Sequence, residues 1–246
     1  MKKRGQATIL IVVAVVILAI VGLYFVFKTP DTGNNQKIAP EVAPIHSFVE
    51  SCISEMGANA VFYIGLTGGY FKVPEISTEN NIAYYLYNGE NYMPSKTRVE
   101  KELSTYMDEI LSNCIDDFKT YPEFNIKPGV ISTTTKIEDE KVIFNVNYPI
   151  TLSKGEKNYQ FNEFKNIEVP IRLGIVFSVV QEIMDEQMFD KKSICINCVT
   201  NFAIQKDLVV RLDDDKEANI VVFNVIDKKS KYGDIDFSFS FANKYG

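Results

Sequence analysis

The sequence predicts an α+β domain behind an N-terminal transmembrane helix. Three observations carry this prediction: an uncharged apolar run at residues 7–27, helical spacing of apolar residues after residue 45, and period-two alternation between residues 129 and 170. Helix faces recur every three to four residues, whereas half-buried strands alternate every two, so each pattern identifies its element. We therefore expect several helices and an antiparallel sheet in one domain.

The run from Ala7 to Phe27 is long enough to cross a bilayer. Its 21 residues include 15 that are Ile, Leu, Val or Phe, and none is charged. At roughly 1.5 Å per residue it extends about 31 Å as a helix, and a hydrocarbon core is about 30 Å thick. A cleaved secretory signal has a shorter apolar part and a small-residue cleavage site, which is missing after this run. We interpret the run as a retained anchor in contact with membrane lipid.

The charges on either side of the run indicate its orientation. Lys2, Lys3 and Arg4 precede it, whereas Lys28 alone follows it directly. Basic residues favour the cytoplasmic side, so we expect a single-pass protein of the cell membrane whose C-terminal domain lies outside. That outer part holds all 32 acidic residues against 23 basic ones, a formal charge of −9. Such a surface repels phosphates, so we expect no nucleic-acid partner.

The residues before the run carry a family resemblance. The segment from Lys3 to Thr8 resembles the class III signal peptides of archaeal type IV pilin-like proteins, which a peptidase cuts between Gly and Gln. The resemblance implies a cut between Gly5 and Gln6, with the helix left attached, and a role as a filament or pseudopilin subunit. It departs at Leu10, where the family usually has the Glu associated with subunit assembly.

A linker is expected between the anchor and the domain. Residues 29–44 contain three prolines and one glycine without a helical or strand period. Proline and glycine interrupt helices, so the membrane helix should end here. The expected organisation is a cytoplasmic start at 1–6, the span at 7–27, the linker at 28–44 and an extracytoplasmic domain at 45–246.

The domain is expected to begin with an amphipathic helix. Apolar residues from Ile45 to Met56 follow helical spacing, and Gly57 suits the end of the helix. The only histidine, His46, lies off this stripe, so we expect it on the surface without a catalytic role. The glycine pair at 68–69 predicts a turn, since it lacks the spacing of a phosphate-binding loop.

Two further helices are expected. A capping box from Thr97 to Glu100 begins one, whose apolar face runs from Val99 to Phe118. Pro170 opens the other, which should extend to about Met188.

The four cysteines are candidates for disulfides, because the expected location is oxidising: Cys52, Cys114, Cys195 and Cys198. Cys52 and Cys114 each lie on the apolar face of a helix, so they are placed to pair. The Cys195-x-x-Cys198 motif resembles thioredoxin-type motifs in spacing alone. Three interpretations stay open: a local structural disulfide, an oxidoreductase in which Cys195 attacks and Cys198 resolves, and a zinc site formed by all four cysteines.

A β-hairpin is expected around Asn88-Gly89, which is a strong two-residue turn signal. Four tyrosines of this hairpin are candidate recognition residues, because exposed tyrosine offers large contact area with few rotatable bonds: Tyr84, Tyr85, Tyr87 and Tyr92. The alternative is simple alternation, with half of them packed inward.

Strands dominate the remainder of the domain. Alternation at 142–148, with flanking strands at 130–137 and 151–169, predicts an antiparallel meander, and three more strands follow residue 207. The acidic stretch at 213–217 lacks the spacing of a calcium loop and predicts a solvated turn.

The domain also resembles uncharacterised single-pass membrane proteins of small-genome archaea. The residues that carry this resemblance are Phe48-Val49-Glu50-Ser51-Cys52, Gly68-Gly69-Tyr70 and the segment from Tyr84-Tyr85 to Pro94-Ser95. The resemblance implies the layout of anchor and domain, and no activity.

These patterns favour a membrane-anchored extracytoplasmic interaction module of the cell envelope, which recognises an unknown envelope protein or polymer. We find no catalytic motif and no metal-binding spacing beyond the cysteines, so we expect neither enzyme activity nor a cofactor. A pilin-like filament subunit and a membrane-tethered thiol–disulfide oxidoreductase are the alternatives.

Overall fold

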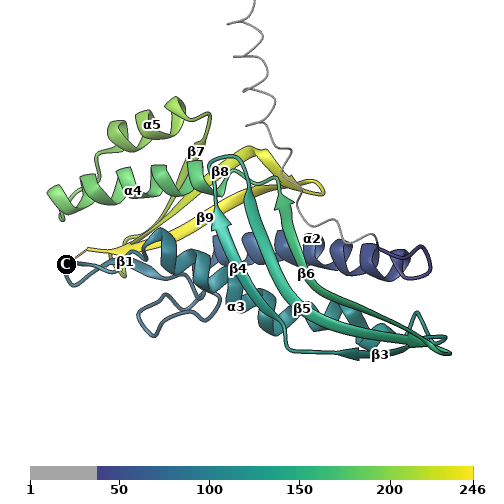
Figure 1. Cartoon of the computed structure of the whole chain (residues 1–246). Coiled ribbons are helices and arrows are strands. Elements are labelled where there is room, and N and C mark those ends of the chain that lie inside the picture. The colour runs from purple at the N-terminus through teal and green to yellow at the C-terminus, as the bar shows by residue number, and fades with distance from the viewer. Residues whose placement is uncertain (1–37, 246) are drawn as a thin grey trace, which may run out of the picture. The chain divides into compact units, whose positions relative to one another are not determined.

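The structure is a computed structural model that describes residues 38–245 (Figure 1). The predicted anchor at 7–27 and the predicted cleavage site between Gly5 and Gln6 lie outside these residues. Within the described part, four α-helices and two sheets form a domain from Pro44 onward, which confirms the α+β class. No helix between residues 38 and 245 is long and apolar enough to cross a membrane.

The first helix, α2 (Ala43–Leu66), continues ten residues beyond Met56, where the stripe that predicts it ends, because Gly57 does not end the helix. A Cβ on Gly57 would lie 2.8 Å from a ring carbon of Phe144, so this glycine allows the helix to pack closely on a strand. The helix ends instead at Gly68 and Gly69, whose φ angles are +73° and +84° and which thus form the predicted turn.

A five-stranded sheet has the strand order β2-β1-β9-β8-β7. Its members are β1 (Tyr84–Tyr87), β2 (Glu90–Asn91), β7 (Val209–Asp215), β8 (Ile220–Tyr232) and β9 (Ile235–Lys244). β1 and β2 form the predicted hairpin, in which Asn88 and Gly89 adopt positive φ. β1 also pairs in parallel with β9, and the remaining pairs are antiparallel.

A second, antiparallel sheet contains the predicted meander. Its members are β3 (Asn125–Pro128), β4 (Ser132–Ile137), β5 (Val142–Lys154) and β6 (Lys157–Val169). β3 and β4 pair with successive halves of one edge of β5, and β6 pairs along the other edge. The sequence gives no sign of β3, since its four residues include a proline and are mostly exposed.

The second helix, α3 (Lys96–Ile115), begins one residue before the predicted capping box. Ser95 is its N-cap, and the Ser95 side chain accepts a hydrogen bond from the Arg98 backbone N–H. Glu100 does not close a capping box, because its carboxylate accepts from the backbone N–H of Ile137 at 3.0 Å. That bond ties α3 to β4, and a 3₁₀ turn (Asp116–Phe118) follows the helix.

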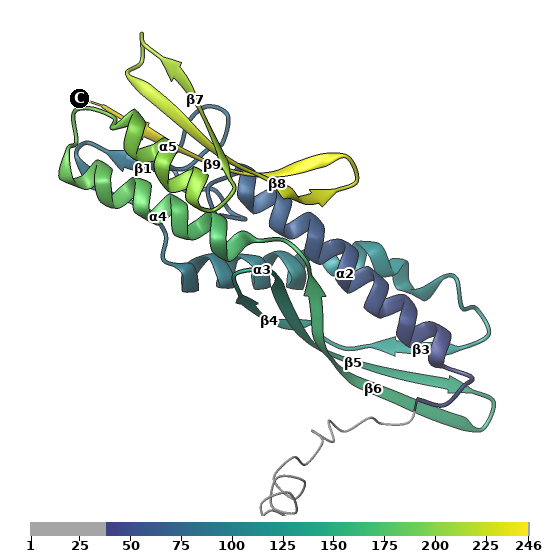
Figure 2. The same ribbon diagram turned by 90° about the horizontal axis from the view of Figure 1, so that it is seen from above.

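The remaining helices, α4 (Leu173–Phe189) and α5 (Ile196–Gln205), run side by side in both views (Figures 1 and 2). Phe177 of α4 contacts Phe239 of β9, and Phe62 of α2 contacts Phe237 of the same strand. Because side chains alternate along a strand, α2 and α4 cover one face of the five-stranded sheet. The opposite face carries the even-numbered residues of β9 and, up to the register shift after Asp227, those of β8.

Candidate functional site

A groove of about 570 Å³ lies on the sheet face opposite α2 and α4. Its floor includes Tyr84 of β1, Val222 of β8 and Lys244 of β9, and its walls are residues 77–80 and 213–215. Successive strand pairing brings these segments together, since Asp213 pairs with Val222, Val222 with Ala242, and Ala242 with Tyr84. The site therefore combines parts of the chain that are far apart in sequence.

The groove is acidic. Its lining contains the carboxylates of Glu79, Asp213, Asp214 and Asp215, and among its lining residues Lys244 is the one cation. Asp215 accepts from the backbone N–H groups of Glu217 and Ala218, so it closes a turn at 216–219. The prediction of a turn at 213–217 is wrong for 213–215, which belong to β7 and pair with β8. Asp213 accepts from the Asn224 side chain at 2.7 Å, which fixes its carboxylate beside the floor. This arrangement favours cationic ligands over anionic ones.

The candidate recognition tyrosines do not form one surface. Tyr85 is fully buried, where its ring stacks on Phe241 at 4.8 Å and its hydroxyl donates to the carbonyl of Gly68 at 2.8 Å. Burial raises the pKa of Tyr85 well above 10. Tyr85 therefore offers no contact area to a partner, and its role is to hold the end of α2 against the sheet.

The other three tyrosines, Tyr84, Tyr87 and Tyr92, form what we term the tyrosine row. Ring centroids are 5.3 Å apart between Tyr84 and Tyr87 and 6.5 Å apart between Tyr87 and Tyr92. Lys244 Nζ lies 5.8 Å from the centroid of the Tyr87 ring. The row thus begins in the groove at Tyr84 and continues to the exposed Tyr92 on the hairpin.

The four cysteines form two separate disulfides. Cys52 of α2 is joined to Cys114 of α3, with a Cα–Cα distance of 5.7 Å, and Cys195 is joined to Cys198. The zinc site of four cysteines is therefore not assembled, because the first pair is bonded to itself. Within residues 38–245, the group of Cys195, Cys198 and Glu186 is the one cluster with metal-ligand geometry, and its sulfurs are occupied by their own bond.

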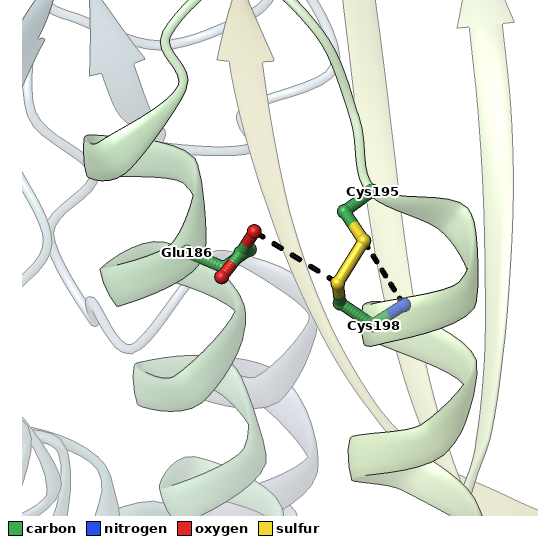
Figure 3. A group of neighbouring side chains, drawn as sticks. All are labelled: Glu186, Cys195 and Cys198. Atoms are coloured by element: carbon green, nitrogen blue, oxygen red, sulfur yellow. Dashed lines mark hydrogen bonds between the residues drawn. A yellow bond between two sulfur atoms is a disulfide. The ribbon is translucent and has the colours of Figure 1, made fainter.

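The Cys195–Cys198 disulfide lies where α5 begins (Figure 3). Cys195 is the N-cap of α5, and its Sγ accepts from the Cys198 backbone N–H at 3.3 Å. Glu186 reaches across from α4, with its Oε1 3.8 Å from the Cys198 Sγ. The sequence contains no signal for Glu186, because its approach depends on how α4 packs against α5.

The prediction that His46 lies on the surface is wrong. Its side chain is 16 % exposed, with Nδ1 3.3 Å from a carboxylate oxygen of Glu50. The rings of Phe161 and Phe164 on β6 lie 5.1 and 4.8 Å away. The strand β6 covers the start of α2, which helical periodicity alone does not reveal.

Comparisons of the chain with protein-family models, curated proteins and solved structures give no match.

Proposed function

We propose that this chain is a membrane-anchored protein of the cell envelope whose domain binds a partner outside the cell. The apolar run at 7–27, its basic start and the proline-containing linker support the anchor and its orientation. The groove is the observation that carries the binding role. Its volume of about 570 Å³ lies within the range of ~300–1,000 Å³ typical of ligand sites.

The partner that this groove fits is a positively charged segment of an envelope protein or polymer. The acidic lining residues attract amino or guanidinium groups, and two members of the tyrosine row, the half-buried Tyr87 and the exposed Tyr92, offer ring surface to the same cations. Tyrosine also provides contact area at a small entropic cost, which suits a binding surface.

Binding is tested with the full-length chain in detergent and two ten-residue peptides, one rich in lysine and one rich in glutamate. We expect calorimetry to show binding of the lysine peptide alone, weakened by salt. The double variant Asp213→Asn/Asp214→Asn should bind about fivefold more weakly, since each exposed ion pair contributes up to about 1 kcal/mol. The matched control is Glu156→Gln/Asp234→Asn, which removes two exposed turn carboxylates outside the groove. Equal weakening by both double variants would contradict binding in the groove.

The anchor is tested separately by membrane fractionation. The full-length chain should stay with membranes after an alkaline wash, whereas a chain that begins at residue 28 should be released. External protease should cleave the domain in intact spheroplasts, and protection of the domain would reverse the proposed orientation. Intact mass of the membrane-extracted protein tests the cut between Gly5 and Gln6, and its absence would remove the filament-subunit alternative.

A further inference from the structure

We propose that Cys195 and Cys198 form a redox site that exchanges its disulfide with cysteine pairs of unfolded polypeptides. This activity goes beyond partner binding in the groove, and neither depends on the other. Three observations support it: the position of the disulfide at the surface, the different surroundings of its two sulfurs, and an uncharged apolar face beside it.

The disulfide is placed for reaction more than for crosslinking. Cys195 and Cys198 are separated by three residues and both are half-exposed, so the bond joins no distant parts of the chain. Cys195 also lines a recess of about 40 Å³ together with Ile183 and Gln187 of α4. An incoming sulfur therefore has open space next to Cys195.

The two sulfurs differ in charge environment. The Cys195 sulfur accepts a backbone N–H at the N-terminus of the ten-residue helix α5, and both the hydrogen bond and the helix dipole favour a thiolate there. The Glu186 carboxylate lies 3.8 Å from the Cys198 sulfur and within 4.8 Å of the Cys195 sulfur, so its negative charge favours the neutral thiol more strongly at Cys198 than at Cys195. After reduction, the Cys198 S–H is placed to donate to Glu186.

The open space beside Cys195 assigns it as the sulfur that is attacked, and its stabilised thiolate makes it the better leaving group in the second step. A substrate thiolate attacks Cys195 Sγ and forms a mixed disulfide with it, while the Cys195–Cys198 bond breaks. Cys198 takes the electron pair of that bond and the proton that the substrate thiol released. The second substrate thiolate then attacks the substrate sulfur of the mixed disulfide and expels Cys195 as a thiolate. The substrate gains a disulfide and loses two electrons, and the protein disulfide gains them as the Cys198 thiol and the Cys195 thiolate. The proton of the second substrate thiol goes to solvent, and no other oxidant takes part.

The face around the disulfide suits an unfolded polypeptide. The sequence of α5, INCVTNFAIQ, contains no charged residue. Large apolar side chains are exposed on and beside it: Phe189 (90 %), Ile196 (53 %) and Ile204 (65 %). An unfolded chain exposes apolar side chains around its cysteines, so it gains contact area here that a small hydrophilic thiol does not.

The site is tested in the full-length protein in detergent with two disulfide probes. One is an uncharged apolar peptide whose single cysteine is linked to thionitrobenzoate, and the other is the symmetrical aryl disulfide without peptide. At pH 7 the Cys198→Ala variant, in which Cys195 is free, should release the chromophore from the peptide about tenfold faster than Cys195→Ala. Equal rates, or rates no higher than that of free cysteine, would overturn the proposal.

The polypeptide specificity has its own control. In the Cys198→Ala background, Ile196→Ser/Ile204→Ser should slow the reaction with the peptide probe several-fold and leave the aryl disulfide unaffected. Ile235→Ser, at a residue 66 % exposed at the start of β9, should change neither rate. If the peptide has no advantage over the aryl disulfide in Cys198→Ala, the substrate is a small thiol and the polypeptide assignment is wrong.

Glu186 acts as a positioning residue through the charge on its carboxylate. In the reduced protein, alkylation mapped by mass spectrometry should show Cys195 reacting faster than Cys198 at pH 7. Glu186→Gln should raise the Cys198 rate several-fold and the Cys195 rate less, because the amide keeps the shape and removes a charge that lies nearer to Cys198. A general loosening of the site would raise both rates equally, and either that outcome or no change would contradict this role.

Discussion

The two disulfides of this domain occupy contrasting surroundings. Cys52–Cys114 links α2 to α3 across 62 residues, and Cys52 is buried in the core. Cys195–Cys198 spans three residues at the half-exposed start of α5. In the chain-entropy description the first is worth about 4 kcal/mol and the second about 2 kcal/mol, because a longer loop restricts the unfolded chain more. The same covalent bond is thus a crosslink in one region and an accessible reactive group in the other.

The region around the exposed disulfide is secured by other contacts. Arg172, at the start of α4, donates from Nη2 to the carbonyl of Lys206 at 2.8 Å, just after α5. Its Nε lies 3.4 Å from the carboxylate of Asp227 on β8, and Asp227 is fully buried. Arg172 therefore joins both helices to the sheet without any contribution from the cysteines.

The largest effect is expected for Arg172→Ala. Removal of the guanidinium leaves the buried Asp227 carboxylate without its cation, which costs about 3–5 kcal/mol of unfolding free energy. Urea denaturation measures this loss, and Arg211→Ala, at an exposed position on β7, should stay within about 0.5 kcal/mol. A loss below that of the Cys195/Cys198 double variant would mean that the exposed disulfide secures α4 and α5 after all.

Removal of the buried disulfide should come next. Cys52→Ala/Cys114→Ala is expected to lower the unfolding free energy by about 4 kcal/mol, through greater freedom of the unfolded chain. Denaturant titration of the oxidised protein and of this variant gives the difference. A loss under about 1 kcal/mol would show that α2 and α3 pack equally well without the bond.

A smaller effect is expected at the exposed disulfide. Cys195→Ala/Cys198→Ala should cost about 2 kcal/mol or less, since the closed loop is short. Graded reductant followed by alkylation and peptide mass mapping should open this disulfide before Cys52–Cys114, because access to a sulfur controls exchange. Simultaneous reduction of both would contradict the contrast between the two regions.

The smallest effect concerns the tyrosine that joins α4 to the end of β9. Tyr245 donates a hydrogen bond to Gln187 at 2.5 Å, and Tyr245→Phe should cost about 1 kcal/mol of unfolding free energy at pH 8.

Burial raises the pKa of Tyr245 to about 12 from 10.0. The folded protein therefore keeps this proton when the unfolded chain has lost it, and stability is lost as the pH rises from 10 to 12. Denaturation at pH 8 and 11 should show a smaller alkaline loss in Tyr245→Phe, and equal losses would remove this tyrosine as a cause.

Local patterns in the sequence predict most of the elements but not where they pack. The Asn88-Gly89 hairpin and the meander follow from turn chemistry and alternation, which are properties of short stretches. Gly57 leads to a wrong helix end, because a glycine inside a helix cannot be told from one at its end by local sequence. Its close packing against Phe144, which the sequence does not show, explains why a glycine stands inside α2. His46 misleads for the same reason, since β6 covers it from more than 100 residues away in sequence.

The features of the candidate sites also divide into those that the sequence predicts and those that only the packing of elements reveals. The cysteine motif and the tyrosines are visible in the sequence, and Cys52 and Cys114 are placed to pair by their helical faces. The groove and the approach of Glu186 to Cys198 are not visible, because they require the packing of separate elements. The burial of Glu102 is also not visible in the sequence. Its position in an amphipathic helix suggests a solvated carboxylate, but the carboxylate is buried and accepts a hydrogen bond from the backbone N–H of Phe71.

The parallel pairing of β1 with β9 constrains how the domain acquires its structure during synthesis. Leu86 donates to the side chain of Asn243, and Ala242 donates to the carbonyl of Ala83, across about 157 residues of chain. β9 is the central strand of the five-stranded sheet, between β1 and β8. The two pairs of strands on either side of it therefore cannot join into one sheet before residues 235–244 have been synthesised. Contacts of such high sequence separation form late. The five-stranded sheet can therefore close only after nearly the whole chain has been synthesised.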